Sequence, residues 1–525
     1  MPTTSLQKTS FTLYLFGVFL LAVSMPWSKF LMSNAQIILL ISWLMDAALL
    51  EKLKKFRKNK TALVLSSMFL LHIIGLCYTT DMHYGMEDVR KKIPLMLLPL
   101  IFSTSPPISK KMLEKILSMF VLSVVMASMV CFIALLGYTK KEILEPRDAS
   151  IFISHIRFSL MISIAIFMLG YFFHQNKNLL FKILYAGVIF WLLLFLLMME
   201  AETGIICVIA VTLLLLFYFF LKIEKVMLKL ALIPCILLSV FWGGYFLFSN
   251  QGNNNEKNSE YNNTLPILTK TGNTYFNDTV NQETENGNNV WIRLCEKELE
   301  EEWNKKSNLN YSEKDLKGNE LKYTLIRFMT SKGLNKDSEG VNLLSEEEIK
   351  SIEKGKINVN YIGILNPFAG VSKIKWEFEN YLRGGNPSGH SVTQRFEFWK
   401  AAIGIIKENF WLGVGTGDSK IAFEKQYEKI NSPLKKEWRF RSHNQFFAIA
   451  VALGIFGLLW FLFTLFYPVI KEKKIFSYLY FTFFATALLS FFAEDTLETQ
   501  AGVTFFAFFN SLFLFCQKKE DHTVS

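Results

Sequence analysis

The sequence predicts an all-α membrane protein that crosses the bilayer about twelve times. Of its 525 residues, 51% are hydrophobic, 50 are phenylalanine, and the mean hydropathy is +0.27, which is too apolar for a soluble globule. The apolar residues also gather in runs, and a run of roughly 20 residues is enough to cross about 30 Å of hydrocarbon. A single long polar segment separates the ninth run from the tenth. These observations together favour a polytopic membrane protein with one large loop outside the bilayer.

Twelve runs qualify as spans in chain order. They are residues 11–25, 34–50, 61–78, 93–104, 113–137, 151–173, 179–199, 203–221, 229–249, 444–468, 475–493 and 500–516. The fourth run is short and contains Pro94 and Pro99. The first run is not followed by a small-residue cleavage site and a polar continuation, so we expect a retained helix and not a cleaved signal peptide.

The formal net charge of +11 does not by itself indicate a nucleic-acid partner. In a membrane protein, basic residues gather on the cytoplasmic side, so their distribution predicts how the chain is oriented in the membrane. Twelve crossings put both ends of the chain on one side. That side holds 18 lysines and arginines in its ends and short loops, against seven on the other side. We therefore expect cytoplasmic termini, with the long polar segment outside the membrane, in the periplasm if the source is Gram-negative.

This orientation divides the chain into four regions. Residues 1–249 form the first nine helices, 250–443 the outer loop, 444–516 the last three helices, and 517–525 a cytoplasmic tail. Five of the six cysteines lie in apolar runs and Cys295 stands alone in the loop, so no disulfide framework is expected.

The outer loop has two parts with different compositions. Residues 250–290 are dense in asparagine and cannot bury enough apolar surface to fold alone, so they are interpreted as a flexible insertion. From residue 291 to 443, apolar residues return among lysine and glutamate, which predicts short amphipathic helices. For residues 291–388 a structural cap without chemistry is the favoured interpretation.

An amphipathic helix is predicted over residues 392–409. Ser391 and Gln394 have the spacing of a capping box, and large apolar residues then recur at helical intervals. Arg395 falls in the first turn, where the helix dipole disfavours a cation. It is therefore either solvated or compensated by a nearby anion.

The glycines of GVGTGD, from Gly413, favour a tight turn over a nucleotide site. They lack the GxxxxGK[ST] spacing, and Asp418 stands where a dinucleotide motif needs its third glycine. The sequence also has no DxD pair for a metal-bound nucleotide sugar and no HExxH or CxxC spacing. We expect no metal and no cofactor.

The junction before the tenth run concentrates positive charge on an outer membrane edge. It carries Lys435, Lys436, Arg439 and Arg441. These residues either contact anionic headgroups or cradle a lipid-linked diphosphate, for which the forked donors of arginine are suited.

His443 is the candidate general base of this junction. Ser442 and Gln445 have capping-box spacing, which predicts that His443 and Asn444 lie in the first helical turn. The positive helix end and Arg441 both disfavour an imidazolium ion, so we expect a neutral ring that can take a proton from a hydroxyl. A histidine at a helix start can also be only an interfacial residue.

Charged residues inside or between apolar runs are costly and therefore indicate function. His155 and Arg157 begin the sixth run, and we expect Arg157 to face an internal cavity as a diphosphate contact. Acidic residues join the seventh run to the eighth and the eleventh to the twelfth: Glu200, Glu202, Glu494, Asp495 and Glu498. They could pair with the arginines, orient His443 or end helices, and pairing is favoured.

Three segments in order resemble the superfamily of O-antigen ligases and O-antigen polymerases, which are bacterial membrane glycosyltransferases. The segments are QRFEFWKAAIGIIKEN from Gln394, LGVGTGD from Leu412 and RSHNQFF from Arg441, the last leading into an apolar helix. The stretch that contains them, residues 389–460, covers about one-seventh of the chain. The pieces HIRFSLMI from His155 and EDTLETQAGVTFFAFF from Glu494 are similar to segments of members from Bacteroidetes.

The resemblance implies transfer of a glycan from undecaprenyl diphosphate to an acceptor hydroxyl at the outer leaflet, without a metal. It implies that His443 deprotonates the acceptor and that arginines hold the diphosphate. The diphosphate contacts are then Arg157, Arg395, Arg439 and Arg441, and the supporting residues are His155, Asn444, Glu494 and Asp495. An outer loop longer than is usual in the superfamily leaves the acceptor open.

Several activities fit these features. The first is ligation of an O-antigen-type glycan to lipid A-core, and close alternatives are polymerisation of repeat units and glycan transfer to protein hydroxyls. All three use the same donor, so the donor site does not separate them. A transporter or flippase is the alternative of a different class, but such proteins usually have two similar halves, and no internal repeat is visible here.

Overall fold

The computed structural model divides the chain into two compact units. Unit 1 comprises Met1–Lys141, Arg147–Leu215 and Pro387–Ser525, and unit 2 comprises Glu142–Pro146 and Leu216–Asn386. The structure describes residues 5–45, 48–139, 143–222, 265–281, 283–359, 377–378, 380–382, 385–474 and 477–516.

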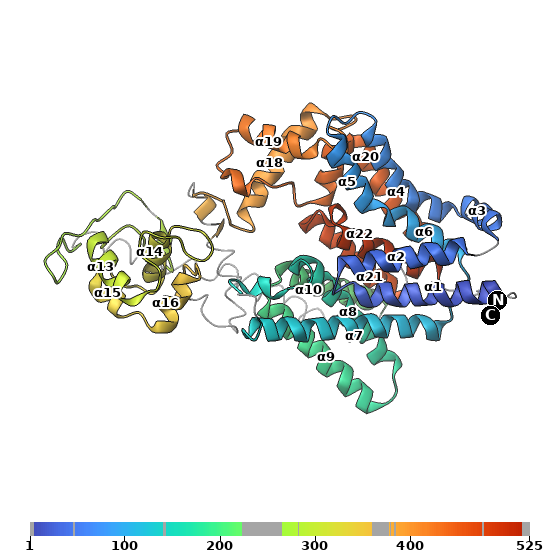
Figure 1. Ribbon diagram of the computed structural model, residues 1–525, viewed down its shortest axis with the longest axis horizontal. Helices are drawn as coiled ribbons and strands as arrows, with labels where there is room; N and C mark the ends of the chain where they lie inside the picture. The colour runs from blue at the N-terminus through green and yellow to red at the C-terminus, as the bar shows by residue number, and fades with distance from the viewer. Residues whose placement is uncertain are drawn as a thin grey trace. The chain divides into compact units, whose positions relative to one another are not determined.

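Unit 1 is helical (Figure 1). Its helices are α1 (Ser5–Ser24), α2 (Lys29–Leu44), α3 (Leu49–Lys58), α4 (Lys60–Leu76), α5 (Met82–Lys92), α6 (Pro94–Thr104), α7 (Lys110–Leu135), α8 (His155–Gln175), α9 (Leu179–Met198), most of α10 (Glu202–Lys222), α18 (Thr393–Glu408), α19 (Ser419–Lys429), α20 (Gln445–Lys471), α21 (Tyr478–Ala493) and α22 (Gln500–Phe515). Helices coincide with eleven of the twelve predicted runs, and the run 229–249 lies outside the described residues.

Six of the described helices are long and apolar enough to cross a membrane: α1, α7, α8, α9, α10 and α20. The predicted run 34–50 is interrupted, because α2 and α3 meet at an angle of 108°, and this pair makes a seventh candidate only if it counts as one span. Helices α4, α21 and α22 are apolar but shorter. The chain is therefore a mostly helical, multi-pass membrane protein.

Helix α22 forms the centre of unit 1. It is apolar on all sides and buried along nearly its whole length, which is typical of a core helix. It packs on α6, α2 and α21 (Figure 1). Its buried amide, Asn510, accepts a hydrogen bond of 3.0 Å from the Tyr480 hydroxyl, so this polar group is not left unsatisfied in the core.

The bundle of unit 1 has two distinguishable ends. The Tyr14 hydroxyl lies 3.6 Å from the Cys516 thiol, which places the last residues of α22 beside the first half of α1. The Gln500 amide donates to the Ser33 hydroxyl at 2.6 Å, which places the start of α22 beside the start of α2. The loop that precedes α22 is therefore at the end opposite to Ser5 and Cys516.

Helix α20 is broken at Gly454, where φ is 64° and ψ is −165°. At the break the glycine-rich turn docks on the helix backbone: the Val414 N–H donates to the Val451 carbonyl and the Gly415 N–H to the Ala452 carbonyl, each at 2.9 Å. The Ile455 N–H in turn donates to the Phe410 carbonyl at 2.8 Å. The turn thus satisfies backbone groups that the break would leave bare in an apolar environment.

The other side of this turn holds the end of α4 and the start of α5. The Thr416 N–H donates to the Gly75 carbonyl at 3.1 Å. The Asp418 carboxylate accepts from the N–H groups of Thr80 and Asp81, both at 2.8 Å. Burial raises the pKa of Asp418, but these donors outweigh it and hold the pKa below its usual value. The tight turn expected from the glycines is confirmed, and it clamps α4, α5 and α20 together.

The described residues of unit 2 between 265 and 359 form four helices and a two-stranded hairpin. They are α13 (Glu296–Lys306), α14 (Leu321–Ser331), α15 (Ser338–Asn342), α16 (Glu346–Glu353), β1 (Thr284–Glu285) and β2 (Asn288–Asn289). Their core is apolar and includes the fully buried Trp303 and Phe328. The short amphipathic helices predicted beyond residue 291 are therefore present.

The prediction of a flexible insertion is wrong for the described residues of its second half. Residues 265–281 and 283–290 belong to the fold of unit 2. The Thr269 hydroxyl donates to Glu298 at 2.5 Å, the Tyr275 hydroxyl donates to Asp337, and β1 pairs with β2. Polar side chains here replace the apolar core that the composition lacks. Residues 250–264 lie outside the described residues.

Candidate functional site

The loop between α21 and α22 presents three carboxylates, which we call the carboxylate cluster: Glu494, Asp495 and Glu498. Helix α21 ends at Ala493, and the short 3₁₀ helix η6 spans Thr496–Glu498. Gln445, the first residue of α20, accepts from the Leu497 N–H at 2.7 Å and fixes the loop against α20. The cluster lies at the end of the bundle where α22 begins.

Glu494 joins the three predicted site residues His443, Arg395 and Arg157. Its Oε2 lies 3.0 Å from His443 Nδ1 and 3.4 Å from Arg157 Nη1, and its Oε1 accepts from Arg395 Nη2 at 2.9 Å. Burial raises the pKa of Glu494, but the His443 hydrogen bond and the charges of His443 and the two arginines outweigh burial and hold it below its usual value. Glu494 is therefore an anion that orients three donors.

Arg157 is held inside the site. Its Nε donates to Thr499 Oγ1 at 3.2 Å, its Nη1 to Glu494 at 3.4 Å, and its Nη2 to the Asp495 carbonyl at 3.4 Å. The side chain is 6% exposed. We expected it to face a cavity, but its three guanidinium nitrogens bind protein acceptors. Arg157 therefore fixes the carboxylates of Glu494 and Asp495.

Asp495 links this group to Arg441. Its carboxylate lies 3.2 Å from Arg441 Nη2 and 3.7 Å from Arg157 Nη2. Burial raises the pKa of Asp495, and the nearby cations only partly offset that effect. Burial would lower the pKa of Arg441, but Asp495 and Glu498 raise it, so its positive charge is secure.

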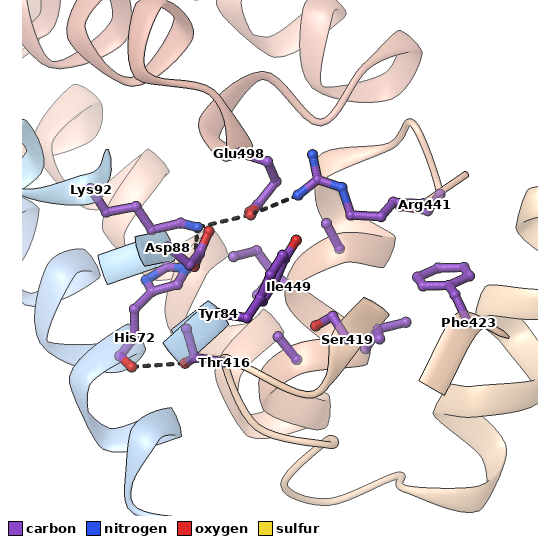
Figure 2. Close-up of a pocket in the computed structure, with 14 residues that line it drawn as sticks. His72, Tyr84, Asp88, Lys92, Thr416, Ser419, Phe423, Arg441, Ile449 and Glu498 are labelled. Atoms are coloured by element: carbon purple, nitrogen blue, oxygen red, sulfur yellow. Dashed lines mark hydrogen bonds and ion pairs between the residues drawn. The ribbon is translucent and has the colours of Figure 1, made fainter. Parts of the chain in front are cut away.

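Glu498 extends the network to α5 (Figure 2). Its Oε2 accepts from Lys92 Nζ at 2.8 Å and lies 3.5 Å from Arg441 Nη1. Lys92 also donates to Asp88 at 2.5 Å. Burial raises the pKa of Asp88 to about 6 despite the nearby Lys92, whereas Lys92 and Arg441 lower the pKa of Glu498 against the effect of burial.

His443 was predicted to lie in the first turn of α20, but it lies two residues before Gln445, the first residue of that helix. Asn444 is the N-cap, and its side-chain oxygen accepts from the N–H groups of Phe446 and Phe447. The expected capping box of Ser442 and Gln445 is therefore wrong, because the Ser442 hydroxyl donates to the Asn444 carbonyl and Gln445 binds the carboxylate loop. Asparagine is itself a strong N-cap and takes that place.

The backbone and ring of His443 are held in a defined orientation. Its φ of 44° is uncommon for a residue with a side chain and indicates a constrained position. The ring packs against Phe398 and Phe440, with centroid distances of 5.5 and 6.2 Å. Since the Glu494 carboxylate only accepts, Nδ1 carries the proton, and in the neutral ring Nε2 is then the basic nitrogen.

Arg395 lies in the first turn of α18, as predicted, and an anion compensates for it. Glu494 supplies that anion. The capping box expected from Ser391 and Gln394 is wrong, because α18 begins after Val392 and has no side-chain cap. Trp399 of the same helix donates from Nε1 to the Ser442 carbonyl at 3.1 Å, so α18 is fixed directly to the His443 segment.

The site is layered from buried anions to accessible donors. The side chains of Glu494 and Asp495 are 1% and 4% exposed, whereas those of Arg395, Arg441 and His443 are 25%, 31% and 31% exposed. Buried carboxylates therefore hold three donors that reach solvent. Such a layer can bind an anion and accept a proton at the same place.

A comparison with protein families finds that residues 356–462 match the family described as O-Antigen ligase. The chain carries an O-antigen ligase domain. The match supports the O-antigen ligase superfamily and spans α18, α19 and the first part of α20, and so includes Arg395, Arg441 and His443. Arg157 and the carboxylate cluster lie outside it. A search of curated proteins finds no match.

Two predicted residues of the O-antigen ligase domain lie apart from the carboxylate cluster. Arg439 donates from Nε to the Leu434 carbonyl at 3.1 Å, and its guanidinium lies 5.9 Å from the centre of the Tyr427 ring. Asn444, besides capping α20, donates to the Phe492 carbonyl at 3.0 Å. Outside the domain, His155 begins α8, two residues before Arg157.

The geometry of three groups at this site would also suit a cation. Ligand atoms of His443, Glu494 and Asp495 lie within 4.8 Å of one another. However, Arg157, Arg395 and the neighbouring Arg441 already pair with these carboxylates, and their positive charges would repel a metal ion. The residues therefore fit a metal poorly.

The contribution of α5 was not predicted from the sequence. The basic residues near Lys92 indicated only an orientation, and no helix was expected over Met82–Lys92. Tyr84, Asp88 and Lys92 recur every four residues and so share one helix face, which was the available signal. Their partner Glu498 is more than 400 residues away in the chain, so sequence spacing alone did not join them.

Proposed function

We propose that this protein moves a glycan from undecaprenyl diphosphate to an acceptor hydroxyl at the outer face of the bacterial inner membrane. The most specific form of this proposal is ligation of an O-antigen-type polysaccharide to lipid A-core. One observation carries it: the buried Glu494 holds both a basic histidine, His443, and a solvent-reaching arginine, Arg395. One carboxylate thereby holds both a base and a side chain that can bind a diphosphate.

In the proposed reaction, His443 Nε2 takes the proton of the acceptor hydroxyl as its oxygen attacks C1 of the donor sugar. The new C1–O bond forms while the bond from C1 to the diphosphate oxygen breaks, so the lipid diphosphate leaves with the bonding electrons. Arg395 and Arg441 stabilise the negative charge that grows on that oxygen. Glu494 keeps the imidazole in the required tautomer and stabilises the imidazolium that forms.

The remaining predicted residues act behind these groups in this proposal. Arg157 positions Glu494 and Asp495 through its buried hydrogen bonds, and Asn444 sets the backbone that presents His443. His155 starts the helix that carries Arg157. Arg439, beside Tyr427 at the outer edge, is suited to the distal part of a diphosphate or to lipid headgroups.

The proposed sidedness rests on charge and on the direction of the bundle. Basic α3 and the start of α7 lie toward the end that holds Ser5 and Cys516, as shown by the Ile108 N–H that donates to the Cys516 carbonyl at 2.8 Å. The carboxylate cluster lies at the other end. With cytoplasmic termini, as the positive-inside rule favours, the site faces the periplasm.

Replacing Arg395 tests the diphosphate contact. The Arg395→Lys variant keeps a charge but loses the fork, and a charge-assisted hydrogen bond is worth roughly 1.5–3 kcal/mol, so we expect the donor KM to rise by about tenfold or more. The matched control is Arg90→Lys, an exposed arginine of α5, which should leave the donor KM unchanged. Steady-state kinetics in proteoliposomes would measure both. An unchanged donor KM for Arg395→Lys would contradict the assignment.

Activity without divalent cations tests the metal-free mechanism. Because three guanidinium groups already neutralise the carboxylates that could hold a cation, we expect purified protein to keep its full transfer rate in EDTA. The measurement is the rate before and after chelation, with added Mg²⁺ as the control. Loss of activity in EDTA that Mg²⁺ restores would refute this mechanism.

The experiment that tests the function itself is reconstitution with undecaprenyl-diphosphate-linked glycan and candidate acceptors. Mass analysis of the product separates the alternatives. Glycan on lipid A-core identifies a ligase, a lengthened lipid-linked glycan identifies a polymerase, and glycan on a protein hydroxyl identifies an oligosaccharyltransferase. Absence of any covalent product, with movement of the lipid-linked glycan across the bilayer, would replace the proposal with transport.

A further inference from the structure

Helix α3 lies across one end of unit 1. It follows α2 at an angle of 108°, and α2 packs along α1, which is long and apolar enough to span the membrane. A helix almost perpendicular to a membrane span runs close to the plane of the bilayer surface. The Ser10 hydroxyl donates to the Ser42 carbonyl at 2.7 Å, so α3 follows α2 at the end of the bundle that holds Ser5, opposite to the carboxylate cluster (Figure 1).

Two lysines on the inner face of α3 fix the helix to the bundle. Lys52 is 7% exposed and donates from Nζ to the Trp43 carbonyl at 3.1 Å, with its ammonium group 5.5 Å from the centre of the Trp43 ring. Lys55 donates from Nζ to the Thr104 carbonyl at 3.3 Å. These carbonyls lie in the last turns of α2 and α6, where they have no partner within their own helix and where the helix dipole favours a cation. The bundle therefore determines which face of α3 points outward.

The outer face of α3 combines unpaired cations with exposed leucines. Its residues are spaced at helical intervals and therefore share one side of the helix: Leu50, Leu53, Lys54, Arg57 and Lys58. The two leucines are 75% and 42% exposed, and the three basic side chains are exposed as well. Within the part of the chain that the structure describes, no carboxylate pairs with these three cations. The outer face is thus strongly positive and partly apolar.

This combination of side chains fits the surface of a bilayer better than it fits water. Water solvates the three cations but leaves the two leucines exposed, whereas at a bilayer surface leucines enter the boundary of the acyl chains and cations reach the phosphates. Attraction to anionic lipid is worth about fivefold in affinity for each lysine or arginine near the surface. The bilayer is also adjacent to α3, because α3 directly precedes the apolar helix α4.

We propose that the outer face of α3 binds anionic phospholipid, with Lys54, Arg57 and Lys58 on the headgroup phosphates and Leu50 and Leu53 among the first carbons of the acyl chains. This lipid site is separate from the proposed glycan-transfer site, because the carboxylate cluster lies at the opposite end of unit 1. The proposal therefore stands whether or not the chain transfers a glycan.

Amide hydrogen exchange of the full-length protein in nanodiscs tests the proposal. We expect exchange of α3 to be slower by about tenfold or more in phosphatidylglycerol than in phosphatidylcholine, because three cations at about fivefold each contribute up to about 10²-fold. Exchange should be equal in the two lipids for a test variant that combines three changes: Lys54→Gln, Arg57→Gln and Lys58→Gln. The matched control removes the same charge from exposed positions of unit 2 and should keep the difference: Lys297→Gln, Lys314→Gln and Lys350→Gln.

Equal exchange of α3 in the two lipids for the unchanged protein would overturn the proposal and leave the outer face to an acidic protein segment. A difference that persists in the test variant would overturn it as well. If the test variant does not fold, Arg57→Gln alone should reduce the difference by about fivefold, and an undiminished difference would count against the proposal.

A soluble anion separates a lipid site from a site for free phosphate. Glycerol phosphate offers the phosphate without acyl chains, so adding it to phosphatidylcholine nanodiscs should leave the exchange of α3 unchanged. Slowing by glycerol phosphate to the same degree as by phosphatidylglycerol would assign the outer face to a free anion and overturn the lipid site.

Discussion

The His443→Ala variant is expected to lose glycan transfer while its amount in the membrane and its affinity for the lipid-linked donor stay unchanged. A positioned general base contributes typically about 10²–10⁴-fold to a rate, so transfer should fall by at least about 10²-fold. The arginines proposed to bind the diphosphate remain, and the histidine lies outside α20, so the helix keeps its Asn444 cap. Single-turnover kinetics and a donor-binding assay would separate the two effects.

The chain offers a matched histidine for this experiment. His83 is exposed on α5, and its replacement by alanine should leave transfer unchanged. Normal glycan display by His443→Ala would end the assignment of His443 as the base. Loss of donor binding together with transfer would instead indicate that His443 holds the diphosphate.

The Gly454→Ala variant is expected to yield little folded protein. At φ 64° and ψ −165° only glycine is comfortable, and a Cβ built there would lie 2.3 Å from the Trp411 carbonyl oxygen and 2.4 Å from its carbon. Both are backbone atoms of the docked turn, so they cannot move without loss of its hydrogen bonds to α20. Fluorescence-detected size-exclusion chromatography before and after heating would measure the yield and the melting temperature.

The control for Gly454 is another glycine of a membrane helix. Gly187 in α9 has open space where a Cβ would be placed, and alanine is the better helix former, so Gly187→Ala should leave the yield unchanged or raise it. Equal yield and melting temperature of Gly454→Ala and the unchanged protein would show that the break in α20 is not essential for folding.

The sequence predicted the features that follow from composition and missed those that depend on distant partners. Apolar runs located eleven described helices because burial in lipid and in the core selects the same residues. Glu494 attracted attention because charges beside apolar runs are costly, and Arg395 because the first turn of a helix disfavours a cation. The sequence alone could not show that Glu494 joins Arg395 to His443, since these three residues lie on separate elements.

The features that were not predicted, or were predicted wrongly, have physical causes as well. The break at Gly454 could not be predicted from the sequence, because the surrounding LGIFG is apolar like the rest of the helix. The turn that hydrogen-bonds to the backbone at the break lies about 40 residues earlier in the chain. The residues that precede Trp291 looked unable to fold, yet their polar groups bind Glu298 and Asp337 in place of an apolar core. Ser442 had capping-box spacing, but Asn444, two residues later, accepts from the N–H groups of Phe446 and Phe447 and is the cap.

The position of the carboxylate cluster near the end of the chain has a consequence for biosynthesis. Arg157 is inserted early, but Glu494 and Asp495, the acidic partners that neutralise it, are translated more than 330 residues later. Nascent protein must therefore hold that guanidinium by other means until the final hairpin arrives, and a prematurely terminated polypeptide would leave it exposed to lipid. The hydrogen bonds that Arg157 makes with this loop can therefore form only after α21 and the loop that follows it have been synthesised.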